Sequence, residues 1–491
     1  MEWPNLLFVL VDQWRRQALG FRNEDPVRTP HLDRFAKSAA VFNHAVATNP
    51  VCGPNRACLF TGQYSLNNGV IANDLRMDEN ARSFGVLCKE AGYQTGYIGK
   101  WHIDGEFGYT PPGKRRQGFD FWHQSVYHAP FEQPYYIQDD PQEVCVDGWA
   151  PDYATQTAQQ FIRDHKENPF ALVVSYGPPH NGGGKEMEET CTPGMLDEDG
   201  EQRYGYGYKA PDEFEAPYRT PEFQALPRRG NVAPVQGKFD SASAVPGYFG
   251  AVTALDHSFG QLLQTLKDEG LEKNTIVVFV SDHGEMLGSH GRMTKDVWYD
   301  ESVGVPCLIG GAGLAPRRVS TPFNSIDLMP TLLELMQIPI PECVDGVSFA
   351  PQLRGEEQSP PDYAFLGFIK GGAPELYRNW RAVYSERYTY VLTDDSQQSR
   401  DTGVAQLGGA ALYDRQQDPL QLNPIVRGQG YDEVMDKLHN VLAEHLNQIE
   451  DPFLEKVWVG RADKTDAADK NARYDALIEW SCKKNAGEVL I

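Results

Sequence analysis

The feature that most constrains the fold of this chain is a repeated alternation of apolar, strand-like runs with amphipathic helical segments. Residues 6–11 form a continuous apolar run that ends at Asp12, which is typical of a central strand buried on both faces. Residues 248–269 place their apolar side chains on one helical face, and another strand-like run follows at 275–280. Alternating strands and helices predict a parallel sheet covered by helices on both faces.

The same alternation recurs earlier in the chain. Helical patterns at residues 82–91 and 154–165 are each followed by a short apolar run, at 93–98 and 170–175. Repeated units of this kind predict an α/β fold in which a large, mixed and mostly parallel sheet lies between layers of helices. Ligands of such sheets bind beyond the carboxyl ends of the strands.

The pattern also indicates how the chain is divided. From residue 365 onward it consists of short alternating runs and a final helix at 432–449, which predicts a small antiparallel sheet. We therefore expect a catalytic α/β domain at residues 1–364 and a smaller α+β subdomain at residues 365–491. Residues 181–246 are rich in Gly, Pro and Tyr without an apolar stripe, so we expect a long loop excursion that serves as a substrate lid.

Charge and cysteine usage exclude several classes of function. The chain of 491 residues carries a formal net charge of −23, which repels nucleic acid and anionic membranes, so neither is expected as a partner. An anionic substrate would require a local cluster of cations that reverses this field. The eight cysteines form no Cys-x-x-Cys pair, and no early apolar run is long enough for an export signal. We expect a cytoplasmic location, or a periplasmic or secreted one if a leader precedes this sequence.

Polar residues follow several of the predicted strands. Asp12, Lys100, His180 and Asp282 all stand at or just after the end of an apolar run, so a doubly wound sheet would bring them to one edge. Cys52 precedes a short helix predicted to open near residue 54. Free N–H groups at a helix N-terminus favour an anion there.

Six ordered segments together resemble the type I, formylglycine-dependent sulfatase family of the alkaline phosphatase superfamily. The resemblance starts at residue 4 and extends to residue 424. The segments that carry it are residues 4–13, 29–33, 52–62, 99–102, 281–284 with Lys295, and 325–330 followed by 412–419. The resemblance implies a sulfuric ester hydrolase with the α/β fold expected above.

In this family the cysteine at the position of Cys52 is oxidised to formylglycine by a dedicated maturation enzyme, which the resemblance implies as a partner. One hydroxyl of the hydrated aldehyde attacks sulfur, and the other then loses its proton so that sulfate is expelled without attack by water. Position 55 is Asn, where the family usually has a small residue. This departure bears on how readily the maturation enzyme converts Cys52.

The resemblance also implies a divalent metal site. Its ligands would be Asp12, Gln13, residue 52, Asp282 and His283. An oxygen-rich set suits Ca²⁺, which is our first expectation, while the neutral amide and the imidazole leave Mn²⁺ or Mg²⁺ as alternatives. Many relatives carry a second acid at position 13 and an amide at position 283.

The cation cluster that an anionic substrate requires is present among the same motifs. The resemblance implies that Arg56 braces the diol, Lys100 and Lys295 hold sulfate oxygens, His102 deprotonates the diol, His180 assists the leaving oxygen with Lys295, and Asn73 contacts the substrate. These roles would reverse the field of the acidic surface at one place.

The substrate class is less constrained by the sequence. The excursion carries aromatic and basic residues that could contact a sugar: Tyr204, Tyr206, Tyr208, Tyr218, Arg228 and Arg229. We therefore expect a sulfated carbohydrate, with a small aryl sulfate as the alternative.

Two other functions remain open at this stage. A phosphonate or phosphate ester hydrolase of the same superfamily would share the fold and the metal site. Lys100 and His102 argue against it, because uncharged residues are expected at these positions in that branch. A catalytically silent binder of sulfated glycans would keep Cys52 as a thiol.

Overall fold

The computed structural model describes residues 3–105, 108–126, 129–182, 207–235, 241–357, 359–369, 380–393, 409–451 and 453. Its centre is a mixed sheet of ten strands in the order β11-β2-β10-β9-β1-β8-β4-β5-β6-β7. The strands are β1 (Asn5–Asp12), β2 (Ala39–Phe42), β4 (Gln94–Lys100), β5 (Phe121–Ser125), β6 (Pro134–Ile137), β7 (Glu143–Cys145), β8 (Phe170–Pro179), β9 (Thr275–Ser281), β10 (Cys307–Gly311) and β11 (Arg317–Val319).

The middle of this sheet is parallel. Strand β1 pairs in parallel with both β8 and β9, and β4 pairs in parallel with β8 and β5. Strand β10 is antiparallel to β9 and β2, so the sheet is mixed. A pair of two-residue strands, β3 (Ala45–Val46) and β12 (Phe323–Asn324), stands apart from it. The predicted α/β class is confirmed.

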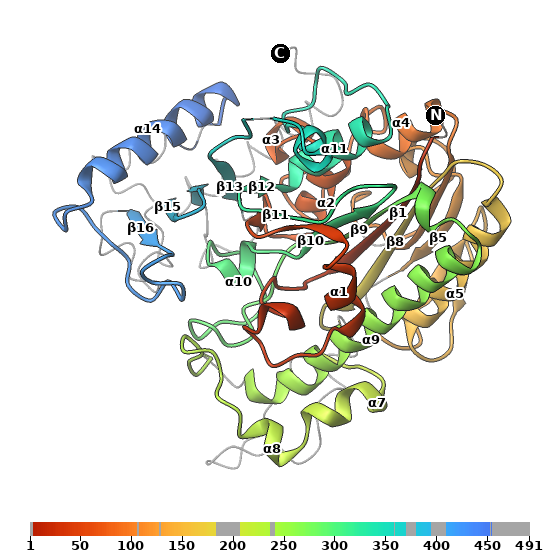
Figure 1. The fold of residues 1–491 in the computed structure, drawn as a ribbon, viewed down its shortest axis with the longest axis horizontal. Helices are drawn as coiled ribbons and strands as arrows, with labels where there is room; N and C mark the ends of the chain where they lie inside the picture. Colours follow the sequence, from red (N-terminus) through yellow and green to blue (C-terminus); the bar gives the residue numbers. More distant parts are fainter. Residues whose placement is uncertain are drawn as a thin grey trace.

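Helices cover both faces of the sheet (Figure 1). Alternate side chains of β1 point to opposite faces: Leu6, Phe8 and Leu10 belong to one buried core, and the residues between them to the other. The first core also contains side chains of α2 (Cys52–Thr61), α4 (Phe84–Glu90) and α11 (Leu328–Leu335). The second contains side chains of α1 (Pro30–Phe35), α5 (Ala150–His165) and α9 (Ser241–Asp268). Smaller helices are α3 (Ser65–Asn68), α10 (Asp300–Val303) and α12 (Ala350–Arg354).

The excursion at residues 181–246 differs from its prediction in two ways. Its described part contains the short helices α7 (Asp212–Glu215) and α8 (Pro221–Gln224). Helix α9 begins at Ser241, so the predicted end of the loop at 246 was wrong. A proline inside a helix, here Pro246, is normally unfavourable, but the burial of Ala244 and Val245 in the second core stabilises the added turns.

The smaller predicted sheet is also present, at the blue end of the chain in Figure 1. Strands β13 (Ala364–Phe368), β14 (Trp380–Tyr384), β15 (Tyr388–Thr393) and β16 (Ala410–Asp414) pair antiparallel in chain order. One face packs against α14 (Asp432–Gln448), and the other packs against α10 and the segment between β9 and α10. The division at residue 364 stays a prediction, and 454–491 lie outside the described residues. No helix in the described segments is both long and apolar enough to cross a membrane.

Candidate active site

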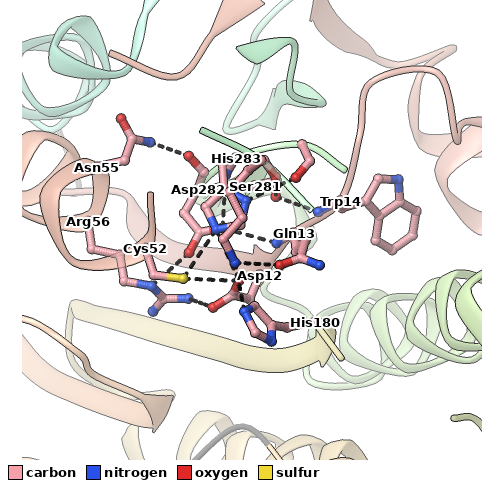
Figure 2. Close-up of polar contacts among 12 residues, drawn as sticks. Asp12, Gln13, Trp14, Cys52, Asn55, Arg56, His180, Ser281, Asp282 and His283 are labelled. Carbon is pink, nitrogen blue, oxygen red and sulfur yellow. Dashed lines mark hydrogen bonds and ion pairs between the residues drawn. The ribbon is translucent and has the colours of Figure 1, made fainter. Parts of the chain in front are cut away.

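The site lies where β1 and β9 end and α2 begins (Figure 2). Asp12 is the last residue of β1, Asp282 follows β9, and Cys52 is the first residue of α2. The pairing of β1 with β8 shifts register between Val11 and Asp12, so the regular ladder breaks just where the chemistry begins. Cys52 therefore stands at the helix N-terminus, as predicted.

Four side chains converge on one point with the geometry of a metal site. Single donor atoms of Asp12, Cys52, Asp282 and His283 all lie within 4.8 Å of one another, and all four residues are buried. The Cys52 Sγ is 3.7 Å from an Asp12 oxygen and 3.2 Å from the His283 Nε2. The family resemblance had implied that these four residues would meet, although they lie as far apart as positions 12 and 283.

The orientation of the His283 ring also suits a metal ligand. Its Nδ1 lies 3.0 Å from the carbonyl oxygen of Gly284, and a carbonyl can only accept, so Nδ1 carries the proton. Burial opposes the charged form of His283, but Asp282 raises its pKa overall. Loss of the Nε2 proton to a bound metal would leave the Nε2 lone pair facing Cys52 and Asp12. Two carboxylates and an imidazole nitrogen form a donor set that suits a divalent cation.

Arg56 and Lys100 neutralise the two carboxylates. Arg56 is fully buried, and it donates from Nε to Asp282 at 2.9 Å and from Nη2 to Asp12 at 3.2 Å. Its Nη1 donates to the Lys100 carbonyl and to Ser175 Oγ. Lys100 Nζ forms a short ion pair with Asp12. Arg56 thus orients the two aspartates, a role beyond the predicted bracing of residue 52.

The charges shift the ionisation of the site. Burial opposes ionisation of Asp12, yet Lys100, His180 and Arg56 hold its pKa below the ordinary value. Burial and then the neighbouring Asp12 raise the pKa of Asp282. Burial also opposes ionisation of Cys52, but Lys100, Lys295 and His283 bring the pKa of its thiol well below the usual range. The surrounding positive groups therefore favour a negative charge at position 52.

The remaining predicted catalytic groups surround position 52. Lys295 Nζ donates to His180 Nε2 at 2.8 Å and to Gln13 Oε1 at 2.6 Å. Burial and then Lys295 lower the pKa of His180 to about 4, and burial and then Lys100 lower the pKa of His102. Both imidazoles also interact with Cys52. Neutral histidines beside position 52 can accept protons near neutral pH.

Asn73 lies beside the same helix start. Its Oδ1 accepts a hydrogen bond from the backbone N–H of Gly53 at 2.9 Å. The structure therefore brings every predicted site residue to one place, including the substrate-binding candidate.

Three residues complete the site in roles that the sequence did not predict. Asn55, the departure from the family pattern, donates to the Asp282 carbonyl oxygen and to Ser325 Oγ, so it ties α2 to the end of β9. Glu285 and Tyr208 both hydrogen-bond the side chain of Gln13. Glu285 could have been found, because it lies three positions after Asp282 in the same motif. Tyr208 offered no local signal.

The structure contradicts the predicted sugar contacts of Tyr208, Tyr218 and Arg229. Tyr208 and Tyr218 are buried within the second core, because their hydroxyls find internal hydrogen-bond partners. Arg229 forms ion pairs with Glu24 and Glu301. Arg228 is exposed and donates to the Ser241 carbonyl at 3.4 Å, so its sugar contact stays a prediction. Tyr204 and Tyr206 lie outside the described residues.

The fold and the site define a class: an α/β protein in which buried Asp, Cys and His side chains meet at a helix start, in an arrangement compatible with a metal ion, with cations around them. The chain belongs to the sulfatase family, since the family described as Sulfatase matches residues 4–338. The family described as N-sulphoglucosamine sulphohydrolase, C-terminal, matches residues 288–448. The recognition made from the sequence is confirmed, and the protein is a sulfatase.

Individual relatives cover nearly the whole chain. An ulvan-active sulfatase of Formosa agariphila is 33% identical over 465 residues, which are 92% of this chain and 82% of that protein. An endo-4-O-sulfatase of Bacteroides thetaiotaomicron is 30% identical over 518 residues, 94% and 95% of the two chains. A solved structure from work on the metabolism of multiple glycosaminoglycans by Bacteroides thetaiotaomicron has a TM-score of 0.80 at 27% identity, and covers 94% of this chain and 99% of its own.

Proposed function

We propose that this sulfatase hydrolyses sulfate esters of a carbohydrate, with a formylglycine at position 52 and a divalent metal beside it. The observation that carries the proposal is the convergence of Asp12, Cys52, Asp282 and His283 within 4.8 Å, against a rim of cations. The carbohydrate is supported by two relatives, an ulvan-active sulfatase and an endo-4-O-sulfatase.

The metal would be held by Asp12, Asp282, His283, the Gln13 side-chain oxygen and the oxygen of the converted residue 52. When bound, it supplies positive charge that stabilises an ionised nucleophile and the sulfate oxygens. The imidazole nitrogen among these ligands favours Mn²⁺, whereas the four oxygen-bearing side chains favour Ca²⁺, which is the sequence-based prediction.

Formylglycine, once hydrated, supplies two hydroxyls: one to attack sulfur and one whose deprotonation releases sulfate. The chain's own residues provide the proton transfers. His102 beside position 52 accepts the proton of the hydroxyl that remains. His180 accepts a hydrogen bond from the Lys295 ammonium and assists the leaving sugar oxygen together with Lys295, whose ammonium supplies the proton. Lys100 and Lys295 bind sulfate oxygens as the charge on them grows.

Maturation is a second part of the proposal. A formylglycine-generating enzyme would convert Cys52, with Pro54 and Arg56 in its recognition sequence. Asn55 is buried in the fold, so its hydrogen bonds to Asp282 and Ser325 form only after conversion if the enzyme acts on the unfolded chain. The cytoplasmic location and the role of residues 181–246 as a lid stay predictions.

A hydrolysis screen tests the function. Sulfated mono- and disaccharides, an aryl sulfate and a phosphonate monoester are offered to the metal-stripped protein, with Ca²⁺ or Mn²⁺ added back. We expect sulfate release from a sugar to exceed the other rates and to require the metal. Faster phosphonate cleavage would instead identify the phosphonate hydrolase alternative.

Mass spectrometry of the peptide that contains residues 52–56 tests the nucleophile. Conversion of the thiol to the aldehyde lowers the peptide mass. An intact cysteine in protein that hydrolyses no ester would support the silent glycan binder.

A further inference from the structure

Glu285 is a buried carboxylate that none of the proposed catalytic steps uses. Four donors converge on it. Its Oε1 accepts from the backbone N–H groups of Leu287 and Thr294, at 2.8 and 2.7 Å. Its Oε2 accepts from Gln13 Nε2 at 2.6 Å and from the Tyr208 hydroxyl at 2.7 Å. The carboxylate therefore joins the loop after β9 to the end of β1.

The hydrogen bonds to Glu285 Oε2 determine the orientation of the Gln13 side-chain amide. The nitrogen and oxygen of an amide have nearly the same shape, so only their partners distinguish the two orientations. A carboxylate can only accept, and an ammonium can only donate. With Glu285 on one side and Lys295 Nζ at 2.6 Å on the other, the amide nitrogen must face Glu285. The amide oxygen then faces Lys295.

The hydrogen bonds to Glu285 Oε1 fix the loop that contains Lys295. Thr294 has a φ of 64° and Asp296 a φ of 79°, so both neighbours of Lys295 are in the left-handed region. For a β-branched residue such as Thr294 this conformation is uncommon and costs energy. The hydrogen bond from the Thr294 N–H to Glu285 stabilises the strained residue immediately before the lysine.

We infer that Glu285 is a positioning residue that turns the Gln13 oxygen toward the metal and places Lys295 for the leaving group. The inference rests on the proposed metal site. One carboxylate thereby couples a predicted metal ligand to a predicted acid, and Tyr208 braces it from the excursion. Partners that orient metal ligands in this way typically change metal affinity about 10- to 100-fold when they are removed.

The substitution Glu285→Gln tests this with little change of shape. Its amide oxygen must still accept from the two backbone N–H groups, so its NH₂ group faces position 13. Two amide nitrogens would then meet, and the Gln13 amide would flip. Its nitrogen would face Lys295 and the metal, where a donor group meets positive charge.

A second substitution should reverse the defect. In the double variant Gln13→Glu/Glu285→Gln, the new carboxylate accepts from the new amide and still offers an oxygen to Lys295 and the metal. Gln13→Glu alone is the control, because it sets two carboxylates against each other. A general gain from added negative charge would appear in both backgrounds, whereas restored orientation would appear only in the Glu285→Gln background.

The experiment measures the Mn²⁺ dissociation constant of each metal-stripped protein and the metal-free melting temperature. We expect Glu285→Gln to raise the dissociation constant about 10- to 100-fold, and the double variant to return it to within about threefold of wild type. Unchanged affinity in Glu285→Gln overturns the inference, as does an equal effect of Gln13→Glu in both backgrounds. A lower melting temperature without rescue of affinity would mean a purely structural role and would also overturn it.

The two proposals fail in different ways. If the wild-type protein binds neither Mn²⁺ nor Ca²⁺, the proposed function and this inference fall together. If wild type binds Mn²⁺ and Glu285→Gln binds it equally well, only the inference falls.

Discussion

The active-site edge of the ten-stranded sheet differs from the small C-terminal sheet in the regularity of its backbone. At the active site the β1 ladder shifts register before Asp12, and Gln13, His102 and Thr294 all have left-handed backbone conformations. In the C-terminal sheet the three strand pairings run without a shift, and no residue of β13 to β16 is left-handed. Of these two regions, only the predicted active site has such irregular backbone within the elements that carry its side chains.

Buried charge is distributed in the same unequal way. Asp12 is shared by Arg56 and Lys100, and Asp282 also contacts Arg56, so four ionic groups form one network. In the C-terminal sheet, Arg381 of β14 forms a buried ion pair with Asp451. The charges of the first region therefore lie where they can serve catalysis, whereas the ion pair of the second region joins two structural elements. Damage to the first should reduce catalysis, and damage to the second should reduce stability.

The largest difference between the regions should follow removal of the nucleophile. Cys52→Ala should lower kcat by at least ~10⁴-fold, since a missing nucleophile leaves only binding and electrostatic effects. Cys58→Ala in the same helix is the matched control. It is also buried, and should cost about 1 kcal/mol of stability through lost packing while kcat is retained. Residual activity of Cys52→Ala near the wild-type level would place the nucleophile elsewhere.

Breaking one ion pair in each region sharpens the contrast. Lys100→Met should lower kcat about 10²- to 10³-fold, because a cation aimed at the sulfate oxygens is lost. Arg381→Met should instead cost about 3–5 kcal/mol of unfolding free energy, because Asp451 is left buried and unpaired. Its kcat should stay near wild type at temperatures where it is folded. Activity assays measure kcat of both variants, and denaturant unfolding measures their stability. A large loss of kcat in Arg381→Met would contradict the proposed division between catalytic and structural ion pairs.

His445 should make the C-terminal region sensitive to acid. It stacks on Phe365, and burial lowers its pKa to about 4. The unfolded chain binds a proton near pH 6.5 but the folded one does not, so stability falls as the pH drops from about 6.5 to about 4. The loss attributable to His445 is up to about 3 kcal/mol.

Unfolding free energies of wild type and His445→Gln across this pH range isolate the contribution. The variant should show a flatter dependence on pH. His439→Gln on the same helix is the control, and its effect should be smaller because His439 is less buried. Equal slopes for wild type and His445→Gln would contradict the prediction.

The smallest expected effect separates two tyrosines of the excursion. Tyr208→Phe removes a hydroxyl that contacts Gln13 and Glu285, and should weaken Mn²⁺ binding by about 1 kcal/mol, roughly fivefold. Tyr218→Phe removes a hydroxyl bonded to Thr253 and Arg28, away from the site. It should lower the melting temperature slightly and leave the Mn²⁺ dissociation constant unchanged. Equal Mn²⁺ dissociation constants in the two variants would show that Tyr208 does not support the metal site.

Much of the fold and most of the site were predictable from the sequence, for identifiable reasons. The strands β1, β4, β8 and β9 were predicted to within a few residues, because burial on both faces leaves long apolar runs. Asp12 and Asp282 were predicted to meet because parallel strands end at one edge. Residues whose role depends on a distant partner escaped detection, as Tyr208 and Asn55 did.

The sequence by itself determined the α/β class and the approximate ends of the central strands, because helix and strand periods are local properties of the chain. The catalytic set was predicted from the resemblance of its motifs to the sulfatase family. Only the tertiary structure decided how these residues are used. It decided that Arg56 spans two aspartates, that the Gln13 amide is turned by Glu285 at a separation of 272 positions, and that Tyr208 points inward. Such pairings depend on packing between elements, which no local pattern contains.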